Sequence, residues 1–208
     1  MMAAFLGGPA SGRCVWETGL PCFLFVLCTA LMGWAMAEAF RKRYGGPGSP
    51  WLILLPTLAS ALLLWRHGFE PELLQGTVLC LTLPYASAAD IRTREVPDCL
   101  SVIIAVAALI GRTPAELPCM LLAAVAVTIP QLAAAVMKPG SYGGADIKIM
   151  AASAFLLSLS HGLAAIIMGL LLALICTAIV RKLRKQAMGA SFALVPYLSA
   201  GILLAYFL

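Results

Sequence analysis

Long apolar runs, each closed by a short cluster of charged residues or of glycine and proline, limit most strongly how this chain can fold. About eight such runs follow one another, at 18–40, 50–65, 72–89, 98–111, 117–137, 147–160, 162–180 and 190–208. A helix needs about 20 apolar residues to cross a bilayer, and somewhat fewer where the membrane thins or the helix is buried in a bundle. The runs therefore predict an all-α, polytopic transmembrane helix bundle of about eight spans.

The low charge content supports a membrane environment over an aqueous one. Only 11% of the 208 residues are charged and 62% are hydrophobic. A soluble domain carries about 25% charged residues, so this chain has too few to cover a surface that faces water. Nothing in the sequence indicates a separate soluble domain.

The basic residues predict the orientation of the spans. If the loop after the first run is cytoplasmic, that side collects 11 of the 14 basic residues: Arg41, Lys42, Arg43, Arg92, Arg94, Lys138, Lys148, Arg181, Lys182, Arg184 and Lys185. The other side holds Arg13, Arg66 and Arg112. The positive-inside rule then places both termini outside the cytoplasm of a multi-pass plasma-membrane protein. The net charge of +5 is thus explained by topology and contact with lipid, and no nucleic-acid partner is expected.

The sequence lacks the residues that several other kinds of catalytic site require. The seven cysteines form no Cys-x-x-Cys pair, so a zinc ribbon or a disulfide framework is not supported. His67 and His161 both fall at outer ends of the predicted spans, which argues against a Ser–His or Cys–His nucleophile. No His-Glu-x-x-His run and no phosphate-binding glycine loop occurs. We expect no metal and no cofactor.

Three aspartates on the predicted cytoplasmic side are candidates for a functional site. Asp98 begins the fourth run, where a carboxylate is expected to cap free N–H groups. Asp146 follows a glycine-rich turn and begins the sixth run, so it could also be a cap. Asp90 closes the third run, at the helix end where the dipole disfavours an anion. Ionisable groups near membrane depth are costly and usually mark a functional site.

Asp90 and Asp146 can form a catalytic pair. They are 56 positions apart (146 − 90) with two predicted spans between them, so both lie on one face of the membrane. When two carboxyl groups come within hydrogen-bonding distance, one keeps a proton and acts as an acid while the other acts as a base. Such a pair hydrolyses a peptide bond without a metal or a covalent intermediate.

Two motifs resemble those of the prepilin leader peptidase family, which comprises type IV prepilin and preflagellin peptidases. The run from Asp90 to the pair Pro97–Asp98 resembles the first motif, an aspartate seven residues before Pro-Asp or Pro-Asn. The run Gly143-Gly144-Ala145-Asp146-Ile147-Lys148 resembles the second, Gly-x-Gly-Asp-x-Lys. The resemblance covers about residues 72–208.

The resemblance implies an intramembrane aspartic endopeptidase with Asp90 and Asp146 as its catalytic pair. It assigns supporting positions to the remaining motif residues, which are Pro97, Asp98, Gly143, Gly144 and Lys148. Enzymes of this kind remove the short basic leader of type IV pilin-like precursors at the cytoplasmic membrane face, usually after a glycine. The implied organisation is a six-span catalytic core at 72–208 preceded by two further spans at 1–71.

The chain departs from the family pattern in two respects. Ala145 stands where the family has its second glycine, and alanine adopts positive φ less easily. The cysteine-rich zinc domain of the longer members is missing, so their N-methylation activity is not carried over. Two alternatives stay open: an ion-coupled transporter that uses aspartates as a proton relay, and a catalytically silent membrane scaffold. Lys148 is interpreted either as a lysine reaching to the interface or as a counter-charge near the pair.

Overall fold

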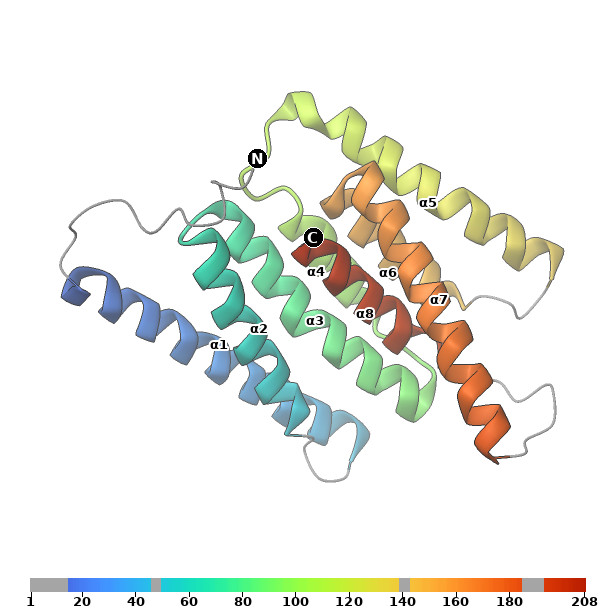
Figure 1. Ribbon diagram of the computed structural model, residues 1–208, viewed down its shortest axis with the longest axis horizontal. Coiled ribbons are helices and arrows are strands. Elements are labelled where there is room, and N and C mark those ends of the chain that lie inside the picture. Colours follow the sequence, from blue (N-terminus) through green and yellow to red (C-terminus); the bar gives the residue numbers. More distant parts are fainter. Residues whose placement is uncertain (1–14, 46–49, 139–142, 185–192) are drawn as a thin grey trace, which may run out of the picture.

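Every helix expected from the apolar runs is present in the computed structural model, which describes residues 15–45, 50–138, 143–184 and 193–208. The elements are α1 (Val15–Tyr44), α2 (Trp51–His67), α3 (Pro71–Thr93), α4 (Asp98–Ala107), the 3-10 turn η1 (Pro114–Glu116), α5 (Leu117–Met137), α6 (Gly144–Leu157), α7 (Leu159–Arg184) and α8 (Val195–Phe207) (Figure 1). The described residues contain no strand, so the predicted all-α bundle is confirmed. Arg13 and Lys185, which entered the charge count, lie outside the described residues.

Helix α3 lies at the centre of the bundle. Helices α1, α2, α4 and α8 all pack against it, and most of its side chains are buried. Its buried polar residues include Thr77 and Thr82, whose hydroxyls donate to the carbonyls of Leu73 and Val78, each at 2.7 Å. A helix that other helices shield from lipid does not have to be apolar, because its polar side chains find partners within the protein. Helix α3 can therefore carry a buried carboxyl group.

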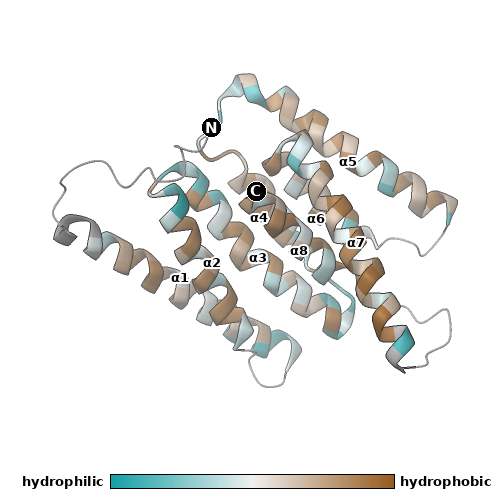
Figure 2. Cartoon of the chain, in the orientation of Figure 1, coloured by the Kyte–Doolittle hydropathy of each residue, from teal (hydrophilic) through white to brown (hydrophobic). Residues whose placement is uncertain are grey.

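Helices α1, α5 and α7 form the apolar periphery. The segments Gly19–Tyr44, Pro114–Met137 and Leu159–Val180 are the three that are long and apolar enough to cross a membrane by length and composition within the described chain. Their exposed side chains are largely leucine, isoleucine and valine. Figure 2 shows the hydrophilic residues gathered near the helix ends. Since lipid is the only solvent in which such a surface is stable, the chain is a membrane protein.

The helices that correspond to the short runs 98–111 and 147–160 have different bounds from those expected. Helix α4 ends at Ala107 instead of continuing to 111, and the chain then turns through Gly111, whose φ is +72°. Helix α6 begins at Gly144, three residues earlier than expected, and ends before Ser158, whose φ is +81°. The ten residues of α4 rise only about 15 Å, half of a bilayer core. Such a helix is covered by its neighbours, and α4 packs on α3 and α6.

The helices alternate in direction between two ends of the bundle (Figure 1). One end, which we call the basic end, holds the last turns of α1, α3 and α5 and the first turns of α2, α4, α6 and α8. Arg41, Lys42, Arg43, Arg92 and Lys148 lie there. The opposite end holds the α2–α3 and α6–α7 turns and η1. At that end the side chain of Arg66 donates to the carbonyl of Phe207, and the hydroxyl of Tyr206 donates to the carbonyl of Glu72.

Candidate active site

Asp90 lies in the last turn of α3 at the basic end, where only 8% of it is exposed. Its Oδ2 accepts a hydrogen bond of 3.1 Å from the backbone N–H of Val195, the first residue of α8. The first N–H groups of a helix have no partner within the helix and carry partial positive charge. The start of α8 therefore offsets the cost of burying a carboxylate at the C-terminal end of its own helix.

Asp146 is the third residue of α6 and is 7% exposed. Its Oδ2 accepts a hydrogen bond of 2.9 Å from the N–H of Gly143, so Asp146 does cap the start of α6, as the sequence allowed. A Cβ on Gly143 would lie 3.0 Å from that same oxygen, which explains a glycine at this position. A Cβ on Gly144 would meet no atom within 4 Å.

Ala145 fits the start of α6 without strain. It is the second residue of the helix, and the only positive φ angles of non-glycine residues in the described chain belong to Arg94 and Ser158. A position with helical φ does not require glycine, and alanine is the residue with the highest helix propensity. The departure from the family motif at this position therefore leaves the start of α6 intact.

The fold brings Asp90 and Asp146 to the same end of the bundle. The two side chains are near enough to interact electrostatically, and each carboxylate lies at the start of a helix. Helices α4 and α8 both pack against α3 and against α6, and so fix the relative position of the two aspartates. A carboxyl group ionises less readily when it is buried near a second carboxyl group. This arrangement is suited to acid–base chemistry.

Asp98 does not have the role expected of it. The residue that caps α4 is Pro97, with extended backbone angles (φ −61°, ψ 128°), and Asp98 makes no capping hydrogen bond through its side chain. Both carboxylate oxygens of Asp98 instead accept from Nζ of Lys148 at 2.8 Å. Because α4 begins at Asp98, the N-cap position falls on Pro97, and the carboxylate of Asp98 is left to bind Lys148. The expectation of a cap at Asp98 was wrong for this reason.

The pairing with Asp98 also decides where Lys148 lies. Its ammonium group binds the first turn of α4 and so connects that helix to α6 just beyond Asp146. Both partners are largely exposed, at 54% for Lys148 and 70% for Asp98. The ion pair therefore lies at the surface of the basic end, beside the buried aspartates.

Comparison with known proteins decides the family. Residues 77–180, half of the chain, match the model of the type IV leader peptidase family. The chain belongs to the type IV leader peptidase family. Both motifs lie within the matched residues, whereas α1, α2 and α8 lie outside them. No curated protein and no solved structure matches the chain at a significant level.

The resemblance to leader peptidases is thereby confirmed, and the chain is a membrane-embedded protease of the leader peptidase type. The N–H of Val195 could not be predicted from the sequence, because a backbone donor has no side-chain signature. It also did not reveal the bond of 3.0 Å between the hydroxyls of Ser87 and Ser199, which connects α3 to α8. His67 and His161 line a shared cavity of about 210 Å³ at the opposite end, far from the aspartates.

Exchanging the charges of Asp98 and Lys148 tests whether their ion pair positions the two aspartates. Either single change, Asp98→Lys or Lys148→Asp, puts like charges in contact and should push α4 away from α6. A displacement of about 1 Å at a catalytic group can cost on the order of 100-fold in rate, so we expect each single variant to lose at least about tenfold in peptidase activity. The double exchange should restore activity to within about threefold of the wild type, because it rebuilds the attraction. A double variant no better than the singles would contradict a positioning role.

Proposed function

We propose that this protease is an aspartic endopeptidase that removes the short basic leader of type IV pilin-like precursors, with Asp90 and Asp146 as its catalytic pair. The observation that carries the proposal is the pair itself: two buried carboxyl groups from distant parts of the chain, at one end of the bundle. Burial of two acids in a membrane protein is costly, and a fold that retains both implies a use for them.

The chemistry follows from one proton held by the pair. The ionised carboxylate takes a proton from a water molecule, and the water oxygen attacks the carbonyl carbon of the scissile peptide bond. The protonated carboxyl group gives its proton to the carbonyl oxygen, which forms a neutral tetrahedral intermediate. When the C–N bond breaks, the first carboxyl group gives the proton taken from water to the leaving amine. The second carboxylate takes back the proton of one hydroxyl group as the carbonyl re-forms. The products are a carboxylic acid on the leader and a free amine on the mature protein.

The membrane face of the proposed reaction follows from the charges at the basic end. The described lysines and arginines there outnumber those at the opposite end, which the positive-inside rule associates with the cytoplasm. A pilin-like precursor presents its basic leader on that side, next to its own apolar helix. Glu95, which is exposed in the loop after α3, and the anionic lipid headgroups are suitable contacts for a basic leader. A role in type IV pilus assembly or protein secretion follows from this substrate.

Co-expression with a pilin-like precursor from the same genome tests the proposal. We expect the wild-type chain to shorten the precursor by the length of its leader on a gel, with a new N-terminus that mass spectrometry places after a glycine. A precursor in which that glycine is replaced serves as the matched substrate control and should stay uncut. If the inserted and accumulated protein leaves every such precursor intact, the proposed function is wrong.

A further inference from the structure

A cavity of about 620 Å³ opens at the end of the bundle opposite the aspartates. Its wall is apolar and comes from three helices, with Met120 and Leu122 from α5, Leu156 from α6, and Leu159 and Leu163 from α7. Leu122 is 58% exposed, so this wall is continuous with the surface that faces lipid. Small-molecule sites typically occupy about 300–1,000 Å³, a range that includes this cavity.

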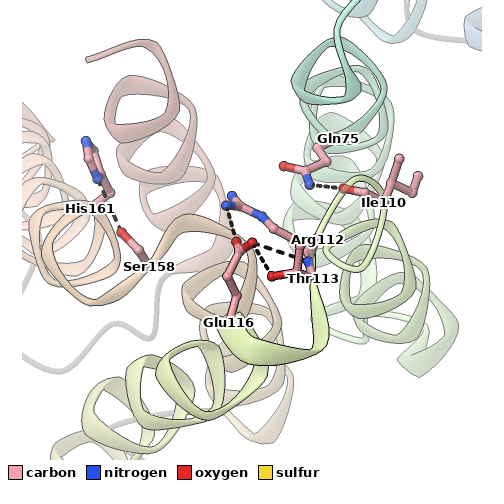
Figure 3. Close-up of polar contacts among 7 residues, drawn as sticks. All are labelled: Gln75, Ile110, Arg112, Thr113, Glu116, Ser158 and His161. Carbon is pink, nitrogen blue, oxygen red and sulfur yellow. Dashed lines mark hydrogen bonds and ion pairs between the residues drawn. The ribbon is translucent and has the colours of Figure 1, made fainter.

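The mouth of the cavity is polar and is arranged around Arg112 (Figure 3). Nη1 of Arg112 donates to Oε2 of Glu116 at 3.0 Å. The other oxygen of Glu116 accepts from the N–H and the hydroxyl of Thr113 at 3.2 and 2.8 Å. A guanidinium group has five N–H donors. Among the described residues, the guanidinium of Arg112 makes a hydrogen bond only through Nη1, so its other donors can bind an anion while Glu116 holds the group in place.

A smaller cavity, with more polar residues in its lining, adjoins the apolar one. The cavity of about 210 Å³ shares Arg112 and Leu156 with its larger neighbour and is lined in addition by His67, Glu72 and His161. Within the described chain, Nε2 of His67 is a buried atom without a hydrogen-bond partner. Arg112 thus lies between an apolar chamber and a smaller chamber whose lining includes histidine and glutamate side chains.

We propose that these two cavities bind a zwitterionic phospholipid, with an acyl chain in the apolar chamber, the phosphate on Arg112 and the headgroup amine near Glu72. An arginine binds phosphate through parallel charge-assisted hydrogen bonds. The acids Glu72 and Glu116 beside it suit a headgroup that also carries a positive charge. The cavity lies where the span Pro114–Met137 begins, which is the depth of a lipid headgroup. The site is separate from the aspartates and independent of the proposed peptidase chemistry.

Native mass spectrometry of the purified full-length protein tests the site, with phosphatidylethanolamine and diacylglycerol of the same acyl chains as probes. We expect phosphatidylethanolamine to be retained at least about tenfold better than diacylglycerol, since diacylglycerol has no phosphate to accept charge-assisted hydrogen bonds from Arg112. Arg112→Gln should remove that preference. Arg66→Gln is the matched control, because Arg66 lies at the same end but lines neither cavity, and it should retain the preference.

A second variant keeps the test valid if Arg112→Gln fails to fold. Leu163→Trp fills the apolar chamber without touching the polar mouth and should lower retention of phosphatidylethanolamine by a similar factor, while the melting temperature in detergent stays near that of the wild type. Equal retention of the two probes by the wild-type protein would overturn the proposal. Tighter retention of phosphatidylglycerol than of phosphatidylethanolamine would overturn it as well, because the acids beside Arg112 would then have no role.

Discussion

Replacing either Asp90 or Asp146 with asparagine is expected to lower leader cleavage by about 10²–10⁴-fold, the usual contribution of a general acid or base. Asparagine has nearly the same shape, and its side-chain oxygen can still accept from the N–H of Val195 or of Gly143. The substitution therefore leaves the packing in place and removes the group that takes up and gives back the proton. Initial rates of precursor processing in isolated membranes, normalised to the amount of inserted protein, measure the effect.

The double variant Asp90→Asn with Asp146→Asn should be little slower than either single variant. Groups that act as one unit lose their whole effect when one of them is removed. Glu95→Gln is the matched control, because it removes an exposed carboxylate from the loop that follows α3 and should leave the rate within about threefold of the wild type. An Asp90 or Asp146 variant that keeps more than about a tenth of the wild-type rate would refute the assignment of the pair.

Gly201→Ala is expected to destabilise the bundle by about 1–3 kcal/mol, the typical cost of overpacking, and to lower cleavage with it. Helices α7 and α8 are in close contact at this residue. A Cβ on Gly201 would lie 2.6 Å from the nitrogen and 2.8 Å from the Cα of Gly169, and backbone atoms cannot move aside as a side chain can. Helix α8 would have to shift away from α7, which would move the N–H of Val195 away from Asp90.

Gly19→Ala provides the matched control for this effect. Gly19 is an exposed residue of α1, and a Cβ there would meet no atom within 4 Å. Alanine is favoured over glycine in a helix by about 0.8–1.0 kcal/mol, so this variant should be as stable as the wild type or slightly more stable. Thermal unfolding in detergent or bicelles, followed by circular dichroism, compares the two variants. Equal melting temperatures for Gly201→Ala and the wild type would show that α7 and α8 can separate without cost.

Much of the fold could be predicted from the amino-acid sequence. The eight helices follow from the apolar runs, because the cost of leaving such runs in water decides that they enter lipid. Helix ends were less predictable. Helix α4 ends at Ala107 because the chain turns through Gly111, and α6 ends where Ser158 adopts a positive φ. These turns depend on how the neighbouring helices pack, and apolar runs carry no information about packing.

The sequence by itself determined that the chain is a helical membrane bundle of the leader peptidase family and that Asp90 and Asp146 share one end. Counting spans is sufficient for that, since two crossings return the chain to the same face. Only the tertiary structure decided how the carboxylates are held. The N–H that binds Asp90 belongs to Val195, 105 positions away, and Asp98 binds Lys148 on another helix instead of capping its own. Hydropathy shows which residues prefer lipid, and motifs show which residues are suited to catalysis. The partners of these carboxylates meet only because α4 and α8 pack between α3 and α6.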